Sequence, residues 1–302
     1  MTAMVILNPY SARWTAQERW PQAEAALKAA GVSFELVISN APGQIVELAV
    51  KAVRDGFSPI IAAGGDGTIG EVVNGMARAA KSENNLLGPL GIIPLGTAND
   101  LVDNLGMPKD LTEAAQVIAG GHSRQMDLGV VNGRYFANNA AIGLEPTVTA
   151  IQEELVWVKG ILRYLLAALM AIFRGPKWDI ELEWDDGKYS GPISLVTVGN
   201  CARTGGLFFM TPHADPFDGK LTFVYGYRKS RGEMLRTLPR TMKPGVGSYV
   251  EMDGIHEVHA TRLRVHLMQP SPAHTDGELF TRAIQDLEYR IIPRKLKLLM
   301  PE

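Results

Sequence analysis

The sequence predicts an α/β plus β protein: a Rossmann-like parallel α/β domain at the amino terminus, followed by a β-sandwich domain. Up to Gly120, short apolar strand-like segments alternate with helical patterns. From Gln125 onwards, strand-like segments with a two-residue period follow one another, and only two long helical stretches interrupt them. The length of 302 residues also favours two domains over one.

In the first domain, each strand signal is a short apolar run and each helix signal has apolar side chains on one face. We expect strands at Met4–Leu7, Phe34–Ile38, Pro59–Ala63 and Leu90–Ile93, with helices at Thr15–Ala30, Gln44–Arg54, Thr68–Ala80, Ala98–Leu105 and Leu111–Ala119. Alternation of this kind predicts a parallel sheet with helices on both faces.

The second domain is predicted mainly from period-two segments and Asp-Gly turns, which are typical of a β-sandwich or an open barrel. We expect strands at Gln125–Val131, Tyr135–Ala140, Trp178–Trp184, Ile193–Gly199, Leu221–Tyr227, Glu257–Ala260, Leu263–Met268 and Asp286–Ile292, and helices near Glu145–Arg174 and Ser230–Met242. The predicted domains are therefore 1–124 and 125–292. The apolar tail Leu296–Leu299 could return to the first domain, but the sequence pattern alone does not decide this.

Composition indicates an ordinary globular protein. Hydrophobic residues make up 46% and charged residues 21% of the chain, and the net charge of −2 gives no sign of a nucleic-acid surface. Cys201 is the only cysteine, which excludes an internal disulfide and fits a reducing cytoplasm. The start of the chain, Met1–Pro9, lacks the pattern of a signal peptide. The apolar run Tyr164–Phe173 is too short to span a bilayer, so we expect a buried helix or one that touches the inner membrane surface.

The most informative stretch is the glycine-rich junction Gly64–Thr68, between a predicted strand and a predicted helix. Glycines permit close approach, and backbone N–H groups at a helix start favour a phosphate. Thr68 with Glu71 matches a capping box. Asp66 would repel a phosphate unless a cation such as Mg²⁺ lay between them. The sequence therefore predicts a triphosphate loop, with a plain tight turn as the alternative.

Two other nucleotide motifs fit poorly. Gly65-x-Gly67-x-x-Gly70 matches the dinucleotide fingerprint, but it follows a third strand, and no acidic residue occurs near Leu90–Ile92 where the fingerprint expects one. The chain also lacks the Gly-Lys-Ser or Gly-Lys-Thr of a Walker A loop.

A second loop, Pro94–Asp100, repeats the arrangement of the first. It follows a strand, contains Gly96, and offers Thr97 as a helix cap with Asp100 three residues later. The segment Asn8–Ser11 follows the first strand. Because the carboxyl ends of parallel strands share one edge, we expect all three segments at the ligand-binding edge of the sheet.

These motifs resemble those of the diacylglycerol kinase catalytic family, whose bacterial members are lipid kinases and whose relatives include sphingosine and ceramide kinases. The resemblance covers nearly the whole chain and rests on separated motifs in order: Gly64–Thr68, Glu71, Asn74–Gly75, Pro94–Asp100, Asp127, Asn132, Gly143, Gly205–Gly206, Asp218–Leu221 and Asp276–Glu278. The first loop is shared with NAD kinases and phosphofructokinases, whereas the second loop and the later motifs are not. The resemblance also implies that the tail, 293–302, rejoins the first domain.

The resemblance implies the following site. ATP would be bound by Asn8, Ser11, Arg13, Ser39, Gly64, Gly65, Asp66, Gly67, Thr68, Ile69, Gly70, Glu71 and Thr97, while Asp66 and Asp100 would organise a catalytic Mg²⁺. A second, structural Mg²⁺ would be held by Asp218 with the carbonyls of Asp215 and Leu221. Asp276 and Glu278 would be the acid–base pair, with Glu278 as the first choice of proton acceptor. On a strand these two residues would face the same side, although Asp-Gly also signals a surface turn.

Two positions depart from the family pattern: Ala12 stands where relatives usually have glycine, and Gly70 where asparagine is common. Neither departure removes a carboxylate. The sequence thus predicts an ATP- and Mg²⁺-dependent lipid kinase of phospholipid biosynthesis, acting on diacylglycerol or a related lipid. The alternatives are an NAD kinase-like or sugar phosphate kinase, a sphingoid- or ceramide-type kinase, and a non-enzymatic nucleotide-binding regulatory protein. The sequence leaves the lipid and the oligomeric state open.

Overall fold

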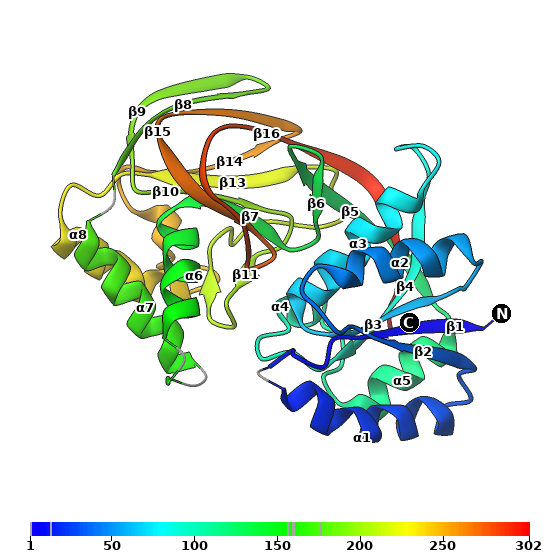
Figure 1. The fold of residues 1–302 in the computed structure, drawn as a ribbon. Helices are drawn as coiled ribbons and strands as arrows, with labels where there is room; N and C mark the ends of the chain where they lie inside the picture. The colour runs from blue at the N-terminus through cyan, green and yellow to red at the C-terminus, as the bar shows by residue number, and fades with distance from the viewer. Residues whose placement is uncertain (1, 13, 156, 159–160, 176) are drawn as a thin grey trace. The chain divides into compact units, whose positions relative to one another are not determined.

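The computed structural model describes residues 2–12, 14–155, 157–158, 161–175 and 177–302 (Figure 1). The chain forms two compact units: Met1–Leu128 together with Ile292–Glu302, and Gly129–Ile291. The strands β5 (Ser123–Val131) and β16 (Glu278–Leu299) each carry the chain from one unit to the other.

The amino-terminal unit is a parallel sheet covered by helices on both faces, which confirms the predicted class. Its strands are β1 (Ala3–Leu7), β2 (Phe34–Ile38), β3 (Ile60–Gly64) and β4 (Leu87–Pro94), and its helices are α1 (Thr15–Ala29), α2 (Gln44–Arg54), α3 (Asp66–Ala79), α4 (Asp100–Asn104) and α5 (Leu111–Gly120). The strands run in the order β4-β3-β1-β2, and the end of β16 adds a further parallel strand beside β4, with Leu296 opposite Leu87. In Figure 1, α1 and α5 lie on one face, and α2 and α3 on the other.

The central strands of this sheet are apolar throughout because both of their faces are covered. Every residue of β1 and of β3 is buried. Val5, Ile61 and Ile93 pack with α1 and α5 around one core, to which Trp20 and Leu27 contribute. These rigid strands fix the loops that leave their carboxyl ends.

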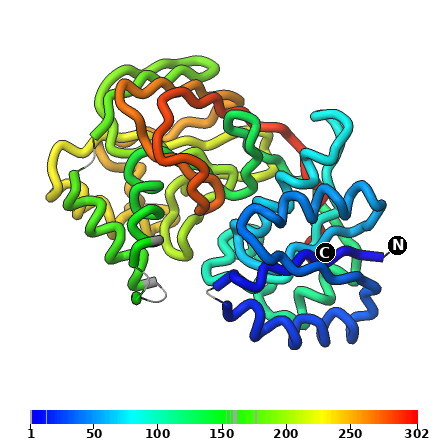
Figure 2. Tube along the Cα trace, in the orientation of Figure 1, coloured from blue at the N-terminus to red at the C-terminus, as the bar shows by residue number. Residues whose placement is uncertain are grey.

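The second unit is antiparallel. Its strands are β6 (Arg134–Phe136), β7 (Asn139–Gly143), β8 (Trp178–Trp184), β9 (Gly187–Ile193), β10 (Leu195–Gly199), β11 (Arg203–Thr204), β12 (Phe208–Phe209), β13 (Leu221–Gly226), β14 (Ile255–Ala260) and β15 (Arg262–Thr275), with the paired parts of β5 and β16; its helices are α6 (Leu144–Glu154), α7 (Ile161–Arg174) and α8 (Arg231–Thr237). Figure 2 traces the same path as a tube. The main strand order is β14-β13-β10-β7-β15, and β8 and β9 extend from β15.

The long strand β15 belongs to both layers of this unit. Its residues Leu263–Leu267 pair with β8, whereas Ala273–Thr275 pair with β7. Register shifts against β16 lie between His266 and His274, a stretch that contains two prolines. Proline removes a ladder donor and bulges bend a strand, so the chain turns there from one layer to the other. The core between the layers includes Ile180, Val198, Phe223 and Val265, and the predicted β-sandwich is confirmed.

Several predicted element boundaries are wrong. The single helix expected near Glu145–Arg174 is two helices, because α6 ends at Glu154 and Leu155 leaves the helical conformation. Part of the connection to α7 lies outside the described residues. The helix expected at Ser230–Met242 continues beyond α8 as a 3₁₀ turn, Leu238–Met242, in which Pro239 lacks the N–H for an α-helical bond. The strand expected at Tyr135–Ala140 is divided between β6 and β7.

Within the part of the chain that is described, none of the helices combines the length and the hydropathy that crossing a bilayer would require.

Candidate functional site: two glycine loops and an acceptor hairpin

The first glycine loop begins α3 earlier than predicted. The helix starts at Asp66 with Gly65 as its N-cap, so the expectation that Thr68 caps the helix is wrong. Thr68 lies inside the first turn, where its hydroxyl accepts a hydrogen bond from Nδ2 of Asn8 at 3.0 Å. The hydroxyl of Ser11 is 3.2 Å from the same oxygen. The carboxyl ends of β1 and β3 therefore do bring Asn8, Ser11 and Thr68 together, as the parallel-sheet argument required.

Close packing within and between the two loops leaves no room for a side chain at Gly64 or Gly96. A Cβ added to Gly96 would lie 2.4 Å from Cα of Gly65, and one added to Gly64 would lie 2.3 Å from Oγ1 of Thr68. The N–H of Leu95 donates to the carbonyl of Gly64 at 2.9 Å. The loops Gly64–Thr68 and Pro94–Asp100 thus form one packed backbone surface.

Asp66 joins these loops by capping the second helix. Its carboxylate oxygens accept the N–H groups of Asp100 at 3.0 Å and of Leu101 at 2.9 Å. The N-cap of α4 is Asn99, with φ of 53°, so the expectation that Thr97 is the cap is wrong. Burial raises the pKa of Asp66 above its usual value, while the amides of Leu101 and Asp100 oppose the rise. Each carboxylate oxygen has a second lone pair, which leaves room for a cation.

The remaining predicted nucleotide residues differ in how far they are buried. Ser39 is buried, and its hydroxyl donates to the carbonyl of Ala41. Buried as well are Ile69, Gly70 and Asp100, whereas Gly67 and Glu71 are half-buried and Thr97 is exposed. Arg13 lies outside the described residues. The sequence reasoning missed Lys109, whose Nζ lies 2.6 Å from Oδ2 of Asp103. The charge of Lys109 also opposes the rise that burial causes in the pKa of Asp66. Only the fold could reveal this lysine, because it follows the second loop in an unremarkable polar segment.

Asp276 and Gly277 form a hairpin turn between β15 and β16, with φ of 49° and 80°. The expectation that Asp276 and Glu278 share one face of a strand is therefore wrong, because Asp-Gly suits the left-handed conformations of a two-residue turn. Asp276 is buried, and its carboxylate accepts the N–H groups of Ala137, Asn138 and Asn139 at 2.8 to 3.2 Å. Glu278 is exposed at the start of β16.

A buried polar network that the sequence did not reveal lies beside this hairpin. Glu145, at the start of α6, accepts hydrogen bonds from Nδ2 of Asn139 at 2.8 Å and from the hydroxyl of Thr197 at 2.7 Å. Nε2 of His274 lies 3.2 Å from the same carboxylate, and His274 is 1% exposed. Burial raises the pKa of Glu145, but His274 and the other donors outweigh burial and hold it below its usual value. Because Asn139 also donates its backbone N–H to Asp276, the network connects to the hairpin.

The predicted structural metal loop is Asp215–Leu221. Oδ1 of Asp215 accepts the N–H of Phe217 at 3.0 Å, and Oδ1 of Asp218 accepts the N–H of Lys220 at 2.8 Å. Both carboxylates are exposed, whereas Leu221 is buried, so only its carbonyl is a suitable ligand. Among the described residues, no three His, Cys, Asp or Glu side chains gather as metal ligands. A cation here would depend on the carboxylate of Asp218 and on the carbonyls of Asp215 and Leu221, which are oxygen ligands suited to a hard ion such as Mg²⁺ or Ca²⁺.

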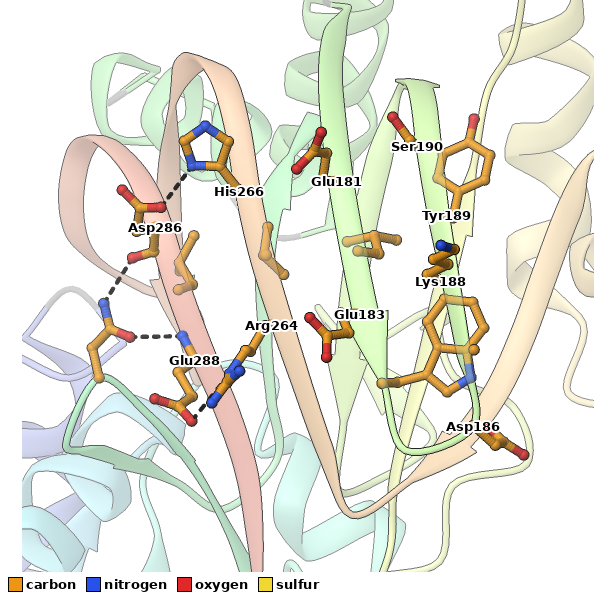
Figure 3. Close-up of a pocket in the computed structure, with 16 residues that line it drawn as sticks. Glu181, Glu183, Asp186, Lys188, Tyr189, Ser190, Arg264, His266, Asp286 and Glu288 are labelled. Carbon is orange, nitrogen blue, oxygen red and sulfur yellow. Dashed lines mark hydrogen bonds and ion pairs between the residues drawn. The ribbon is translucent and has the colours of Figure 1, made fainter.

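A broad groove of about 1360 Å³ lies over β8, β9, β15 and β16 (Figure 3). Its walls carry five carboxylates, those of Glu181, Glu183, Asp186, Asp286 and Glu288. His266 pairs with Asp286 at 2.7 Å, and Arg264 lies 3.7 Å from Glu288. None of the predicted site residues lines it. Lys188, Arg264 and His266 also line this groove, so its charges are mixed.

An α/β unit with paired glycine loops, followed by an antiparallel sandwich, fits the kinase class that the sequence motifs imply. Comparison with known proteins identifies the kinase family that the chain matches. Residues 2–131 match the diacylglycerol kinase catalytic domain, and residues 138–300 match the YegS C-terminal NAD kinase beta sandwich-like domain.

Individual relatives agree with these matches. The diacylglycerol kinase of Bacillus subtilis (strain 168) is 30% identical, covering 91% of this chain and 89% of its own length. That of Staphylococcus carnosus (strain TM300) is 27% identical over 91% and 88% of the two chains. The crystal structure of a diacylglycerol kinase from Bacillus anthracis str. Sterne has the same fold, with a TM-score of 0.72 and 20% identity over 99% of this chain and 97% of that one. The chain belongs to the diacylglycerol kinase catalytic-domain family, a family of lipid kinases, and the predicted resemblance is confirmed.

Proposed function

We propose that this protein transfers the γ-phosphate of ATP to a hydroxyl group of diacylglycerol or a related lipid, with Mg²⁺. The observation that carries this proposal is the packed pair of glycine loops, joined by the carboxylate of Asp66, in a chain of this family. Its product would enter phospholipid synthesis, and its substrate would bring it to a membrane surface.

The nucleotide side of the proposal is the edge of the amino-terminal sheet. Phosphoryl transfer depends chiefly on positioning and on neutralising charge. With no Walker lysine, the amide groups at the start of α3 would receive phosphate oxygens, supported by the exposed hydroxyl of Thr97 and the charge of Lys109. Asn8, Ser11 and Thr68 would add polar contacts from the neighbouring strand ends.

Two magnesium positions suit the residues present. Asp66 and Asp100 would hold the catalytic ion, and Asp215, Asp218 and the Leu221 carbonyl the structural one, since both sets offer the oxygen ligands that Mg²⁺ prefers. When bound, the catalytic ion would neutralise charge on the phosphate oxygens.

On the acceptor side, Glu278 is the proposed proton acceptor. A lipid hydroxyl is a poor nucleophile until its proton is removed. The Glu278 carboxylate takes that proton as the lipid oxygen bonds to the γ-phosphorus, and the bond from phosphorus to the bridging oxygen breaks to release ADP. Both oxygens of Asp276 already accept backbone N–H groups, so we assign Asp276 the role of holding the hairpin.

The test is a kinase assay with labelled ATP and a panel of diacylglycerol, sphingosine, ceramide, NAD and sugar phosphate, followed by chromatography. We expect labelled phosphatidic acid with diacylglycerol. Glu278→Gln should bind ATP normally and lose at least about a hundredfold in turnover, as general-base removal typically does. Glu288→Gln, an exposed carboxylate further along β16, is the matched control. A soluble labelled product, or ATP binding with no product from any acceptor, would overturn the proposal.

A further inference from the structure

The outer side of α7 is apolar. Leu162, Leu166, Leu169 and Phe173 follow a four-three-four spacing, which places them along one side of the helix. The two end members, Leu162 and Phe173, are 64% and 57% exposed, and the two between them are half-buried. A surface helix normally carries polar residues on its outer side. Here two of the exposed side chains, Leu162 and Phe173, are large and apolar.

The opposite side of α7 is already used for packing. Ala167 and Ala171 are buried against α6, where they join Ile151 and Leu155 in a small core. Leu166 also packs against this core, so the large apolar side chains of the outer side that remain exposed are Leu162 and Phe173. Trp157, which is 75% exposed in the segment between α6 and α7, adds an indole ring at the same end of the helix as Leu162. Indole rings favour the boundary between a bilayer and water.

Most of the charged side chains around this surface are positive. The only charged residues of α7 are Arg163 and Arg174. Arg174 and Lys177 are exposed at its carboxyl-terminal end, and a Cβ at Gly175 would lie 3.8 Å from Nε of Arg231, which brings a third cation to that end. The exposed carboxylate of Glu154 lies in the chain near Trp157, at the other end. The basic end suits the phosphates of anionic lipids.

We propose that Trp157, Leu162 and Phe173 dock this protein on the surface of an anionic lipid bilayer, with Arg174, Lys177 and Arg231 facing the lipid phosphates. The inference rests on the proposed function, because a kinase for a lipid must collect its substrate from a membrane. α7 has 14 residues and so measures about 21 Å, shorter than the ~30 Å hydrocarbon core. The helix therefore lies on the bilayer and does not span it.

The charges favour a bilayer over a second copy of the chain as the occupant. In a two-fold symmetric contact the same patch meets itself. Such a contact would gather two sets of arginine and lysine side chains in one interface, with no acidic residue of α7 to neutralise them. Anionic headgroups supply that neutralising charge.

Sedimentation of the full chain with vesicles tests the proposal. We expect binding to vesicles of phosphatidylcholine and phosphatidylglycerol, and weaker binding to phosphatidylcholine alone. The double variant Leu162→Gln with Phe173→Gln should lower the partition coefficient by roughly tenfold or more, because each large apolar side chain buried in a membrane contributes about that factor. Arg174→Gln with Lys177→Gln should lower binding only to the anionic vesicles, by about fivefold per charge, and added salt should reduce the difference.

The matched control is Met268→Gln, which replaces an exposed apolar residue of β15 in the same unit. It should bind vesicles like the unaltered protein. Equal vesicle binding by the Leu162 and Phe173 double variant and by this control would overturn the proposal. So would a dimer that dissociates in the double variant while no vesicles are bound.

Fluorescence quenching locates the contact. Brominated phosphatidylglycerol in the vesicles should quench tryptophan emission of the bound protein, and Trp157→Phe should remove most of this quenching while vesicle binding remains. Unchanged quenching in Trp157→Phe would place the membrane contact elsewhere on the protein.

Substrate choice separates this inference from the proposed function. On a short-chain, water-soluble diacylglycerol, the double variant should keep the turnover of the unaltered protein, whereas on long-chain diacylglycerol in vesicles it should lose roughly tenfold. Absence of kinase activity on both substrates, with vesicle binding that still depends on Leu162 and Phe173, would refute the kinase and leave the docking surface standing. An equal loss of turnover on both substrates would instead refute the docking role.

Discussion

Asp66–Gly67 and Asp276–Gly277 are the same dipeptide in two different settings. The first begins a helix after a parallel strand, and the second turns a hairpin between antiparallel strands. In both, the carboxylate accepts backbone N–H groups from a segment far away in sequence. Asp66 accepts two from α4, and Asp276 accepts three from Ala137–Asn139, where β7 begins. Asp66 is half-buried and Asp276 is buried. The comparison shows that a carboxylate in a family motif can hold two distant segments together by accepting backbone N–H groups.

The largest effect is expected at Asp276. Asp276→Ala leaves three buried N–H groups without their acceptor, and we expect the free energy of unfolding to fall by about 4 kcal/mol in urea titrations. Asp186→Ala, in the exposed Asp-Gly turn between β8 and β9, should change it by less than about 0.5 kcal/mol. If Asp276→Ala unfolds like the unaltered protein yet loses turnover, Asp276 is a catalytic residue and the contrast with Glu278 fails.

A smaller effect on stability is expected at Asp66. Asp66→Ala removes the cap of the five-residue helix α4, and this should cost about 2 kcal/mol of unfolding free energy. ATP affinity should fall more steeply than stability, because the two loops lose their connection and the proposed cation loses a ligand. Calorimetric titration with ATP, with and without Mg²⁺, measures the loss. An affinity that falls equally under both conditions would confine Asp66 to the structural role and remove it from the cation site.

The smallest effect concerns the network beside Asp276, and it depends on pH. The pKa of Glu145 lies below its usual 4.5, so its contribution to stability is present above that pH and is lost as the pH falls through the lowered value. Glu145→Gln should therefore be less stable than the unaltered protein at neutral pH, by about 1 kcal/mol, and the difference should shrink below pH 4.5. A difference that persists unchanged in acid would mean that the charge of Glu145 does not stabilise this region.

The sequence predicted the fold class well because hydrophobic periodicity reports burial directly. The buried runs of β1 and β3 and the one-sided helices α1 and α2 were visible as patterns. The break between α6 and α7 was not predicted, although Lys159 and Gly160 interrupt the apolar run in the sequence there. Helix caps were also missed: Thr68 and Thr97 have the right residue type, yet close packing of Gly65 on Gly96 sets where both helices begin.

For the candidate site, the sequence and the family resemblance predicted which segments take part. The structure shows how the residues within those segments are placed. Asn8, Ser11 and Thr68 meet because parallel strands end at a common edge, which a pattern can predict. The pairing of Glu145 with His274 joins residues far apart in the chain, and neither stands in a motif with a known spacing. Such contacts depend on strand register across the sandwich, which periodicity alone does not determine.

The path of β16 has a consequence for how the protein is made on the ribosome. The amino-terminal unit is synthesised first, but the strand beside β4 comes from Ile292–Glu302, after the whole second unit. Until that strand emerges, the edge of β4 has unpaired backbone groups that invite association with other chains. Although domains generally fold in order of synthesis, here the sheet of the amino-terminal unit is complete only after the whole second unit has been made. The nascent chain therefore depends on the second unit folding promptly, because that unit delivers the strand that closes the sheet of the first.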